Sequence, residues 1–112
     1  MKNDILVVDD EKDIRHLIAG ILQDEGYETR LAWSLDSIKL ELVKRIPSLI
    51  LLDVWLENSS ADGIDILKII KKSYSDIPVI MISGHGTIDM AIKAIRIGAY
   101  DFVEKPFDSN IL

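Results

Sequence analysis

The stretch Ile5-Leu6-Val7-Val8-Asp9-Asp10-Glu11 decides the fold of this chain. Its first four residues are aliphatic with no polar residue between them, which is typical of a strand buried on both faces of a sheet. Three acids follow directly. Parallel sheets bury their central strands between layers of helices, so the stretch predicts an α/β fold with acids at the carboxyl end of the first strand.

Four other segments are expected to be strands of the same sheet. Two are aliphatic runs like the first, and two are more polar, which suits the edges of a sheet. The five expected strands are Ile5–Val8, Glu28–Ala32, Leu49–Leu52, Val79–Ile82 and Tyr100–Val103. Asp53 follows the third strand directly, and Ser83-Gly84 follows the fourth.

Apolar residues recur at helical spacing in each interval between strands. The four stripes are Ile14, Leu17, Ile18, Ile21 and Leu22; Leu35, Ile38, Leu42 and Ile46; Ile64, Leu67 and Ile70, with Ile66 and Ile69; and Ile88, Ala91, Ile92 and Ile95. Gly26, Pro47 and Gly98 are expected to end the first, second and fourth helices. This alternation of strands and helices predicts a parallel sheet with helices on both faces.

The fourth helix is expected to bind a partner as well as the sheet. It carries Met90, Ala94 and Ile97 away from its main stripe, so it is apolar nearly all round. A helix of that kind needs a second apolar partner, which predicts a dimer or a docked domain. At the end of the chain, Asp108 can cap a fifth helix that Ile111 and Leu112 begin, so we expect a piece of a longer protein.

Length and charge narrow the class of protein. The 112 residues suit one domain, and the absence of cysteine excludes disulfides, thiolate nucleophiles and cysteine-based metal sites. The net charge of −6 argues against direct binding of nucleic acid. No stretch resembles a signal peptide or a membrane span, so we expect a cytoplasmic protein without a membrane partner.

Reactive side chains follow four of the five strands. They are Asp9 and Asp10 after the first, Asp53 after the third, Ser83 after the fourth, and Lys105 after the fifth. Ligands of open parallel sheets bind beyond the carboxyl ends of the strands. Crowded carboxylates need a cation, and oxygen ligands favour Mg²⁺. A carboxylate nucleophile, a divalent cation, a hydroxyl and a lysine together predict phosphoryl transfer to an aspartate.

Each of these residues has a plainer interpretation when it is taken alone. The acids Asp9 to Glu11 can cap the first helix, and Asp53 can be a turn residue. The pair Ser83-Gly84 can mark only the end of a strand. The remaining aspartates are expected to be caps, turn residues and solvated groups. Only the conjunction of several such residues, each beyond a different strand, favours a site.

Over its whole length the chain resembles the receiver domains of two-component response regulators. The resemblance rests on Val7–Glu11, Leu52-Asp53, Ser83-Gly84 and Lys105-Pro106-Phe107. It implies one receiver domain over residues 1–112, with a (βα)5 fold, strand order 2-1-3-4-5 and a truncated last helix. It also implies a signalling domain that is no enzyme beyond catalysing its own phosphorylation and dephosphorylation.

The resemblance assigns roles to individual residues. Asp53 takes a phosphoryl group from a phosphohistidine of a sensor histidine kinase. Mg²⁺ is held by Asp10, by Asp53, by the backbone carbonyl of Trp55 and, through water, by Asp9. Lys105 binds the phosphoryl oxygens, and its peptide bond to Pro106 is typically cis. Trp55 and His85 flank the path of the hydrolytic water and are expected to tune the lifetime of the phosphoryl group.

The same resemblance implies a switch. Ser83 moves toward the phosphoryl oxygen and Phe102 rotates inward, which shifts the dimerisation and output face formed by the fourth helix, the fifth strand and the fifth helix. Phe102 can equally be a core or edge aromatic, and Tyr100 is expected to pack. His16 is expected to be solvated.

Two segments resemble the nitrogen-regulator class of receivers in particular. They are Ser83-Gly84-His85-Gly86 and Gly98–Phe102, the latter followed by Lys105-Pro106-Phe107. The long loop Trp55–Gly63 is like that of the NtrX-type branch. Receivers of this class usually precede an ATPase domain and a DNA-binding domain in one chain and control transcription.

Other classes of protein remain as alternatives. A haloacid-dehalogenase-like phosphatase uses similar groups, but its nucleophile lies on the first strand with a second Asp two positions later, whereas Trp55 stands two positions after Asp53. A nucleotide-binding switch needs a Gly-x-x-x-x-Gly-Lys-Ser/Thr phosphate loop, which the sequence does not contain. A degenerate receiver that acts as an interaction module without being phosphorylated is the third alternative.

Overall fold

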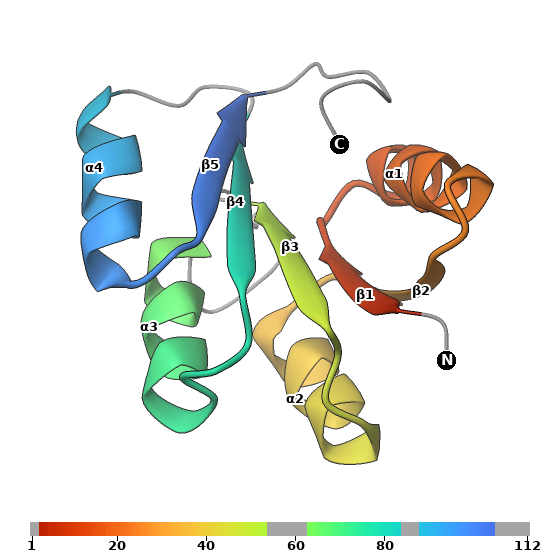
Figure 1. Cartoon of the computed structure of the whole chain (residues 1–112), viewed down its shortest axis with the longest axis horizontal. Coiled ribbons are helices and arrows are strands. Elements are labelled where there is room, and N and C mark those ends of the chain that lie inside the picture. The colour runs from red at the N-terminus through yellow and green to blue at the C-terminus, as the bar shows by residue number, and fades with distance from the viewer. Residues whose placement is uncertain (1–2, 54–62, 84–87, 105–112) are drawn as a thin grey trace.

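The computed structural model describes residues 3–53, 63–83 and 88–104. Five strands and four helices alternate along this part of the chain (Figure 1). In order they are β1 (Asp4–Val8), α1 (Lys12–Asp24), β2 (Glu28–Ala32), α2 (Leu35–Lys44), β3 (Leu49–Asp53), α3 (Gly63–Ser73), β4 (Val79–Ser83), α4 (Ile88–Ile97) and β5 (Asp101–Glu104). Over the described ranges, no helix is both long enough and apolar enough to cross a membrane.

The strands form one parallel sheet in the order β2-β1-β3-β4-β5. This confirms the predicted α/β fold, its 2-1-3-4-5 strand order and the two polar edge strands. Strand order reverses at β1, because the chain goes from β1 to β2 on one side and then to β3 on the other. Since all strands are parallel, their carboxyl ends share one edge, toward which the arrowheads of β3, β4 and β5 point in Figure 1.

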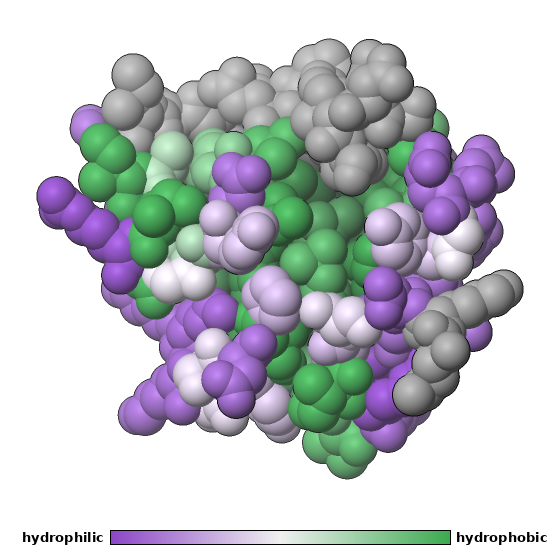
Figure 2. Space-filling model, in the orientation of Figure 1, coloured by the Kyte–Doolittle hydropathy of each residue, from purple (hydrophilic) through white to green (hydrophobic). Residues whose placement is uncertain are grey.

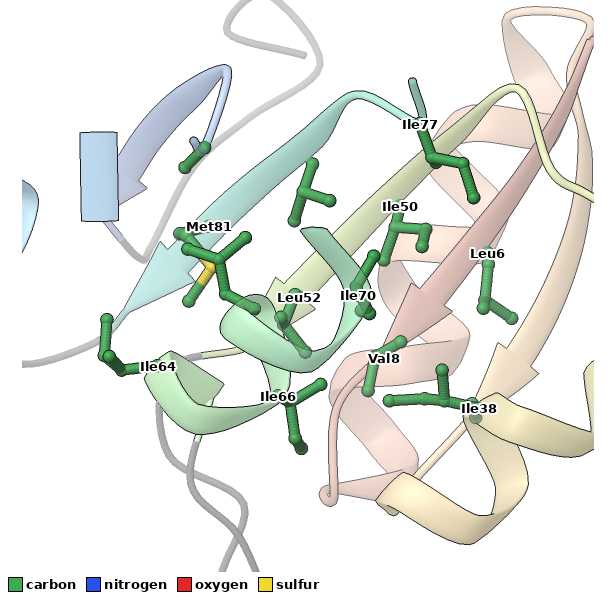
Figure 3. Close-up of a cluster of buried hydrophobic side chains, with 14 of the residues drawn as sticks. Leu6, Val8, Ile38, Ile50, Leu52, Ile64, Ile66, Ile70, Ile77 and Met81 are labelled. Atoms are coloured by element: carbon green, nitrogen blue, oxygen red, sulfur yellow. The ribbon is translucent and has the colours of Figure 1, made fainter. Parts of the chain in front are cut away.

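Alternate residues of the central strands face two different cores. On one side, Leu6 and Val8 of β1 pack with Ile50 and Leu52 of β3 against α2, α3 and α4 (Figure 3). On the other side, Ile5, Val7 and Leu51 pack against α1 in a second cluster that also contains Ile18, Leu22 and Ile82. Burial on both faces explains why these strands are unbroken aliphatic runs instead of alternating ones.

The α1 side of the sheet is also apolar beyond the strands that α1 covers. Leu49, Ile80 and Val103, from β3, β4 and β5, are partly buried against the second cluster. Figure 2 shows hydrophobic residues gathered in the middle of this face, with hydrophilic residues on either side. The fifth helix expected from Asp108 onward lies outside the described residues.

Each of the four predicted apolar stripes contains a member that the fold leaves exposed, which in α3 is Ile69 at 39%. Leu17 of α1 is exposed, and Ile46 lies beyond the end of α2 and is also exposed. In α4 the expected inner face is wrong, because Ala94 is buried while Ile92 and Ile95 are 45% and 48% exposed. The small Ala94 lets α4 approach the core closely, so the larger Ile92 and Ile95 lie toward solvent. α4 therefore has an exposed apolar face, as predicted, but that face carries Ile92 and Ile95 instead of Ala94.

Strand ends differ slightly from the predicted ones. Asp53 and Ser83 are the last residues of β3 and β4 and do not follow them, since their backbones still pair with the neighbouring strands. Tyr100 precedes β5 and is 75% exposed, so the expectation that it packs is wrong. Gly26 and Gly98 end α1 and α4 as predicted, both with positive φ, which glycine adopts without strain.

A buried ion pair lies at the opposite, amino-terminal edge of the sheet. The carboxylate of Asp4 accepts hydrogen bonds from Nε of Arg30 at 3.0 Å and from Nε of Arg45 at 3.0 Å. Arg30 also donates to the backbone carbonyls of Glu41 and Arg45 at 2.8 and 2.9 Å. The network therefore ties the start of β1 to β2 and to the end of α2. The sequence alone suggests no role for Asp4.

Candidate functional site

The fold brings three carboxylates together at the carboxyl edge of the sheet. Val8 lies beside Leu52 in the β1–β3 register, so the next residues, Asp9 and Asp53, are neighbours. Asp10 follows at the start of the turn into α1. Ligand oxygens of these three aspartates all lie within 4.8 Å of one another. The structure thus groups the predicted acidic residues at the point where strand order reverses.

Both the backbone and the side chain of Asp9 make hydrogen bonds. Its N–H donates to the carbonyl of Ala32 at 3.2 Å, which extends the β1–β2 pairing by one residue. Its Oδ1 accepts from the N–H of Glu11 at 3.0 Å. Glu11 is the N-cap of α1 but makes no side-chain capping hydrogen bond. The helix-capping alternative therefore holds only in part, because one Asp9 oxygen binds an N–H at the start of α1.

Burial gives the three carboxylates a strong need for a cation. Asp9 is 0% exposed, Asp53 is 5% exposed, and Asp10 is partly exposed. Like charges this close, and largely removed from water, repel one another, and a positive partner relieves that repulsion. Carboxylate oxygens at the edge of a sheet, with one partly open side, fit a hard divalent ion that keeps some of its water. The donor set therefore fits Mg²⁺.

Two further predicted residues lie among the described ones. Ser83 is fully buried at the end of β4, one strand away from Asp53, which pairs with Ile82. Phe102 of β5 is partly buried and packs against the core formed with α2, α3 and α4. That packing is the core-aromatic alternative for Phe102. His16 is exposed, as expected.

The remaining predicted site residues lie outside the part of the chain that the structure describes. They are Trp55, His85, Lys105 and Pro106. Along the sequence, Trp55 comes after β3, His85 after β4, and Lys105 and Pro106 after β5. The sequence motifs alone therefore carry their proposed roles.

Sequence reasoning missed Arg15. This α1 residue donates from Nη1 to the backbone carbonyl of Asp9 at 2.8 Å, and its guanidinium carbon lies 5.6 Å from the ring centroid of Trp33. A cation six positions after Asp9, in a helix that follows directly, is the only signal that the sequence offers. The Trp33 contact depends on the end of β2 and is invisible in the sequence.

A parallel sheet in the order 2-1-3-4-5 with an acidic site at its carboxyl edge is what the predicted receiver domain requires, and the family comparison agrees. The model of the response regulator receiver domain matches residues 5–112, so the chain belongs to the response regulator receiver domain family. Members of this family are signalling domains. The predicted family is therefore confirmed.

Several of the similar proteins are NtrX regulators. The nitrogen assimilation regulatory protein NtrX of Azorhizobium caulinodans is 54% identical over 112 residues, which are 100% of this chain and 25% of that protein. The crystal structure of the receiver domain of NtrX from Brucella abortus is 56% identical with a TM-score of 0.92, over 96% of this chain and 90% of that one. These matches confirm the predicted resemblance to the NtrX-type branch.

A third match is the solution structure of the beryllofluoride-activated NtrC4 receiver domain dimer. It is 40% identical with a TM-score of 0.88, over 96% of this chain and 88% of that one. The chain spans about a quarter of the length of the curated NtrX relatives, which the alignments cover to 25% and 23%. What the longer relatives do as whole proteins is therefore not carried over to this chain as a finding.

Proposed function

We propose that this receiver domain accepts a phosphoryl group on Asp53 in a Mg²⁺-dependent reaction. The observation that supports the proposal is the cluster of Asp9, Asp10 and Asp53, with oxygens within 4.8 Å of one another at the carboxyl edge of the sheet. A carboxylate oxygen of Asp53 attacks the phosphorus of a donor phosphohistidine, and the bond between that phosphorus and the imidazole nitrogen breaks. The donor nitrogen keeps its electron pair and takes up a proton.

The other residues are proposed to assist this transfer. Asp10, Asp53, the carbonyl of Trp55 and, through water, Asp9 hold Mg²⁺, which neutralises charge on the phosphoryl oxygens. Lys105, followed by Pro106, neutralises a further oxygen. The Ser83 hydroxyl donates a hydrogen bond to the new phosphoryl group, and Phe102 repacks when Ser83 moves. Trp55 and His85 limit access of water, which the decay rate of the adduct measures.

We propose a phosphohistidine of a sensor histidine kinase as the donor. We also propose that residues 1–112 act as the receiver domain within a longer cytoplasmic regulator of transcription, alongside ATPase and DNA-binding domains. One relative, NtrC of Proteus hauseri, is described as a DNA-binding transcriptional regulator. The net charge of −6 argues that the receiver itself does not bind the nucleic acid.

Removal of the metal tests the central proposal. With Mg²⁺ and a small acyl phosphate as donor, we expect the intact mass of the chain to rise by one phosphoryl group. With excess chelator, we expect no adduct, because three crowded carboxylates then repel the anionic donor. Restored labelling on addition of Mg²⁺ is the control. Labelling that proceeds equally with chelator would contradict the proposal, and no labelling with any donor or histidine kinase would favour the unphosphorylated interaction module.

We further propose that phosphorylation promotes a dimer through α4 and β5. Ile92 and Ile95 are about half exposed on α4, which leaves an apolar face that a partner can cover. The similar NtrC4 receiver domain forms a dimer when activated by beryllofluoride. A second copy of this chain is therefore the proposed partner of that face.

Sedimentation in the presence of beryllofluoride tests the dimer. We expect the wild type to shift from monomer toward dimer, and Ile92→Glu to remain monomeric because a carboxylate cannot be buried unpaired in the interface. Val43→Glu on α2 is the matched control, since Val43 is 82% exposed on another helix. Equal loss of dimer in both variants, or no dimer in the wild type, would count against the α4 interface.

A further inference from the structure

We infer that Arg15 is a positioning residue of the acidic site, and that Trp33 holds it in place. The inference rests on the proposed Mg²⁺ site and adds two residues to it. Neither residue offers a ligand atom to the cluster of Asp9, Asp10 and Asp53. Their contribution is geometric: they fix the peptide that carries the first of the three carboxylates.

The anchoring begins at the peptide between Asp9 and Asp10. The Asp9 carbonyl accepts from Nη1 of Arg15 at 2.8 Å, a charge-assisted hydrogen bond to a buried group. The Asp9 N–H is already bound to Ala32 at 3.2 Å. With both backbone groups bonded, the β1–α1 turn has little freedom to rotate, and the directions of the Asp9 and Asp10 carboxylates are set by it.

Trp33 in turn restrains Arg15. The guanidinium lies over the indole at 5.6 Å from its centroid, within the range of a cation–π contact. Trp33 itself follows β2 directly, and its N–H donates to Oγ of Ser37 in the first turn of α2 at 2.9 Å. The Trp33 side chain is half exposed, so its replacement removes little packing from the hydrophobic core. A chain of contacts therefore runs from α2 through Trp33 and Arg15 to the Asp9 carbonyl.

The buried part of Arg15 supports a role in placement. Its Nε is buried and has no hydrogen-bond partner among the residues that the structure describes. A buried donor without a partner costs free energy because it has lost its water. This cost accompanies the position of the guanidinium that brings Nη1 to the Asp9 carbonyl. A lysine has no planar group to lie over the indole, so the two contacts call for arginine in particular.

Charge and geometry predict opposite effects when Arg15 is replaced. A nearby cation repels Mg²⁺, so removal of its charge alone would tighten metal binding. Loss of a group that orients the ligands weakens metal binding, typically by about 10- to 100-fold. The sign of the change in affinity therefore distinguishes a positioning role from a purely electrostatic one.

Calorimetric titration of Mg²⁺ into the chain is the test. We expect Arg15→Met to weaken binding about tenfold, and Arg15→Lys to restore part of that loss. We expect Trp33→Leu to weaken binding by about two- to fivefold, in line with a cation–π contact. The double variant should match Arg15→Met alone, because Trp33 acts through Arg15. Lys12→Met is the matched control, since it removes an exposed cation from the same helix and should not weaken binding.

A second readout needs no metal. The chain has two tryptophans, so in a Trp55→Phe background Trp33 is the one that remains. We expect Arg15→Met to shift its emission and to increase its quenching by acrylamide, while Lys12→Met leaves both unchanged. An unfolding curve for each variant identifies any that fail to fold. If Arg15→Met does not fold, Trp33→Leu still tests the inference, because Trp33 is half exposed.

Each outcome separates this inference from the proposed function. Normal binding of Mg²⁺ by the wild type, with unchanged or tighter binding by Arg15→Met, would overturn the role of Arg15 alone. Equal weakening by Lys12→Met would overturn it as well, because a general charge effect would then explain both. A wild-type chain that binds no Mg²⁺ would refute the proposed metal site and, with it, this inference.

Discussion

Asp53→Asn is expected to abolish the phosphoryl adduct completely. An amide has nearly the same size and shape as the carboxylate but is not a nucleophile toward phosphorus. Asp53 also supplies one of three oxygens that lie within 4.8 Å of one another, so its neutralisation weakens cation binding in the same step. The measurement is the intact mass after incubation with Mg²⁺ and a small acyl phosphate, for the wild type and the variant side by side.

Asp76→Asn is the matched control for this experiment. Asp76 is exposed in the turn before β4, and the same chemical change there should leave labelling at the wild-type level. Labelling of Asp53→Asn equal to that of the wild type would place the phosphoryl group elsewhere. Peptide mapping of the adduct would then identify the residue that carries it.

Asp4→Ala is expected to destabilise the fold by about 3–5 kcal/mol, the usual cost of removing one partner from a buried ion pair. The Asp4 and Arg30 side chains are only 8% and 16% exposed, so without Asp4 the Arg30 charge has little access to water and keeps only Glu41, at 3.3 Å, as an acidic partner. The free energy of unfolding of domains is about 5–15 kcal/mol, so the loss is a large share of it. Urea unfolding followed by circular dichroism measures the difference.

Two further variants separate the parts of this network. Arg45→Met should cost about 1 kcal/mol or less, because Arg45 is 58% exposed and water replaces its contact with Asp4. The double variant Asp4→Leu/Arg30→Met should recover part of the loss, since apolar residues can replace a buried ion pair. A cost below about 1 kcal/mol for Asp4→Ala would show that the buried pair adds little net stability.

The two predictions concern opposite edges of the sheet, and the sequence treats these edges very differently. At the carboxyl edge, a pattern of acids after aliphatic runs identified Asp9, Asp10 and Asp53 directly. At the amino edge, Asp4 only precedes a strand, and its partner Arg30 lies 26 positions away. No local pattern marks such a pair, because it forms only when β1 and β2 lie side by side.

Helix faces show the same limit at a smaller scale. Spacing correctly predicted four helices, yet in α4 it selected Ile92 and Ile95 as inner residues in place of Ala94. When a helix is apolar nearly all round, periodicity does not say which side meets the core. The decision depends on how closely the helix approaches the sheet, and a small residue such as alanine allows the closest approach.

By itself, the sequence determined the fold class, the parallel sheet and the place of the acidic site, because buried strands and amphipathic helices leave periodic patterns that need no partner to be recognised. The tertiary structure alone decided which residues support that site and that sheet. Arg15 meets Trp33, and Asp4 meets Arg30, only after separate elements of the chain have packed together. Contacts of this kind depend on direction and distance in space, which the order of residues along a chain does not record.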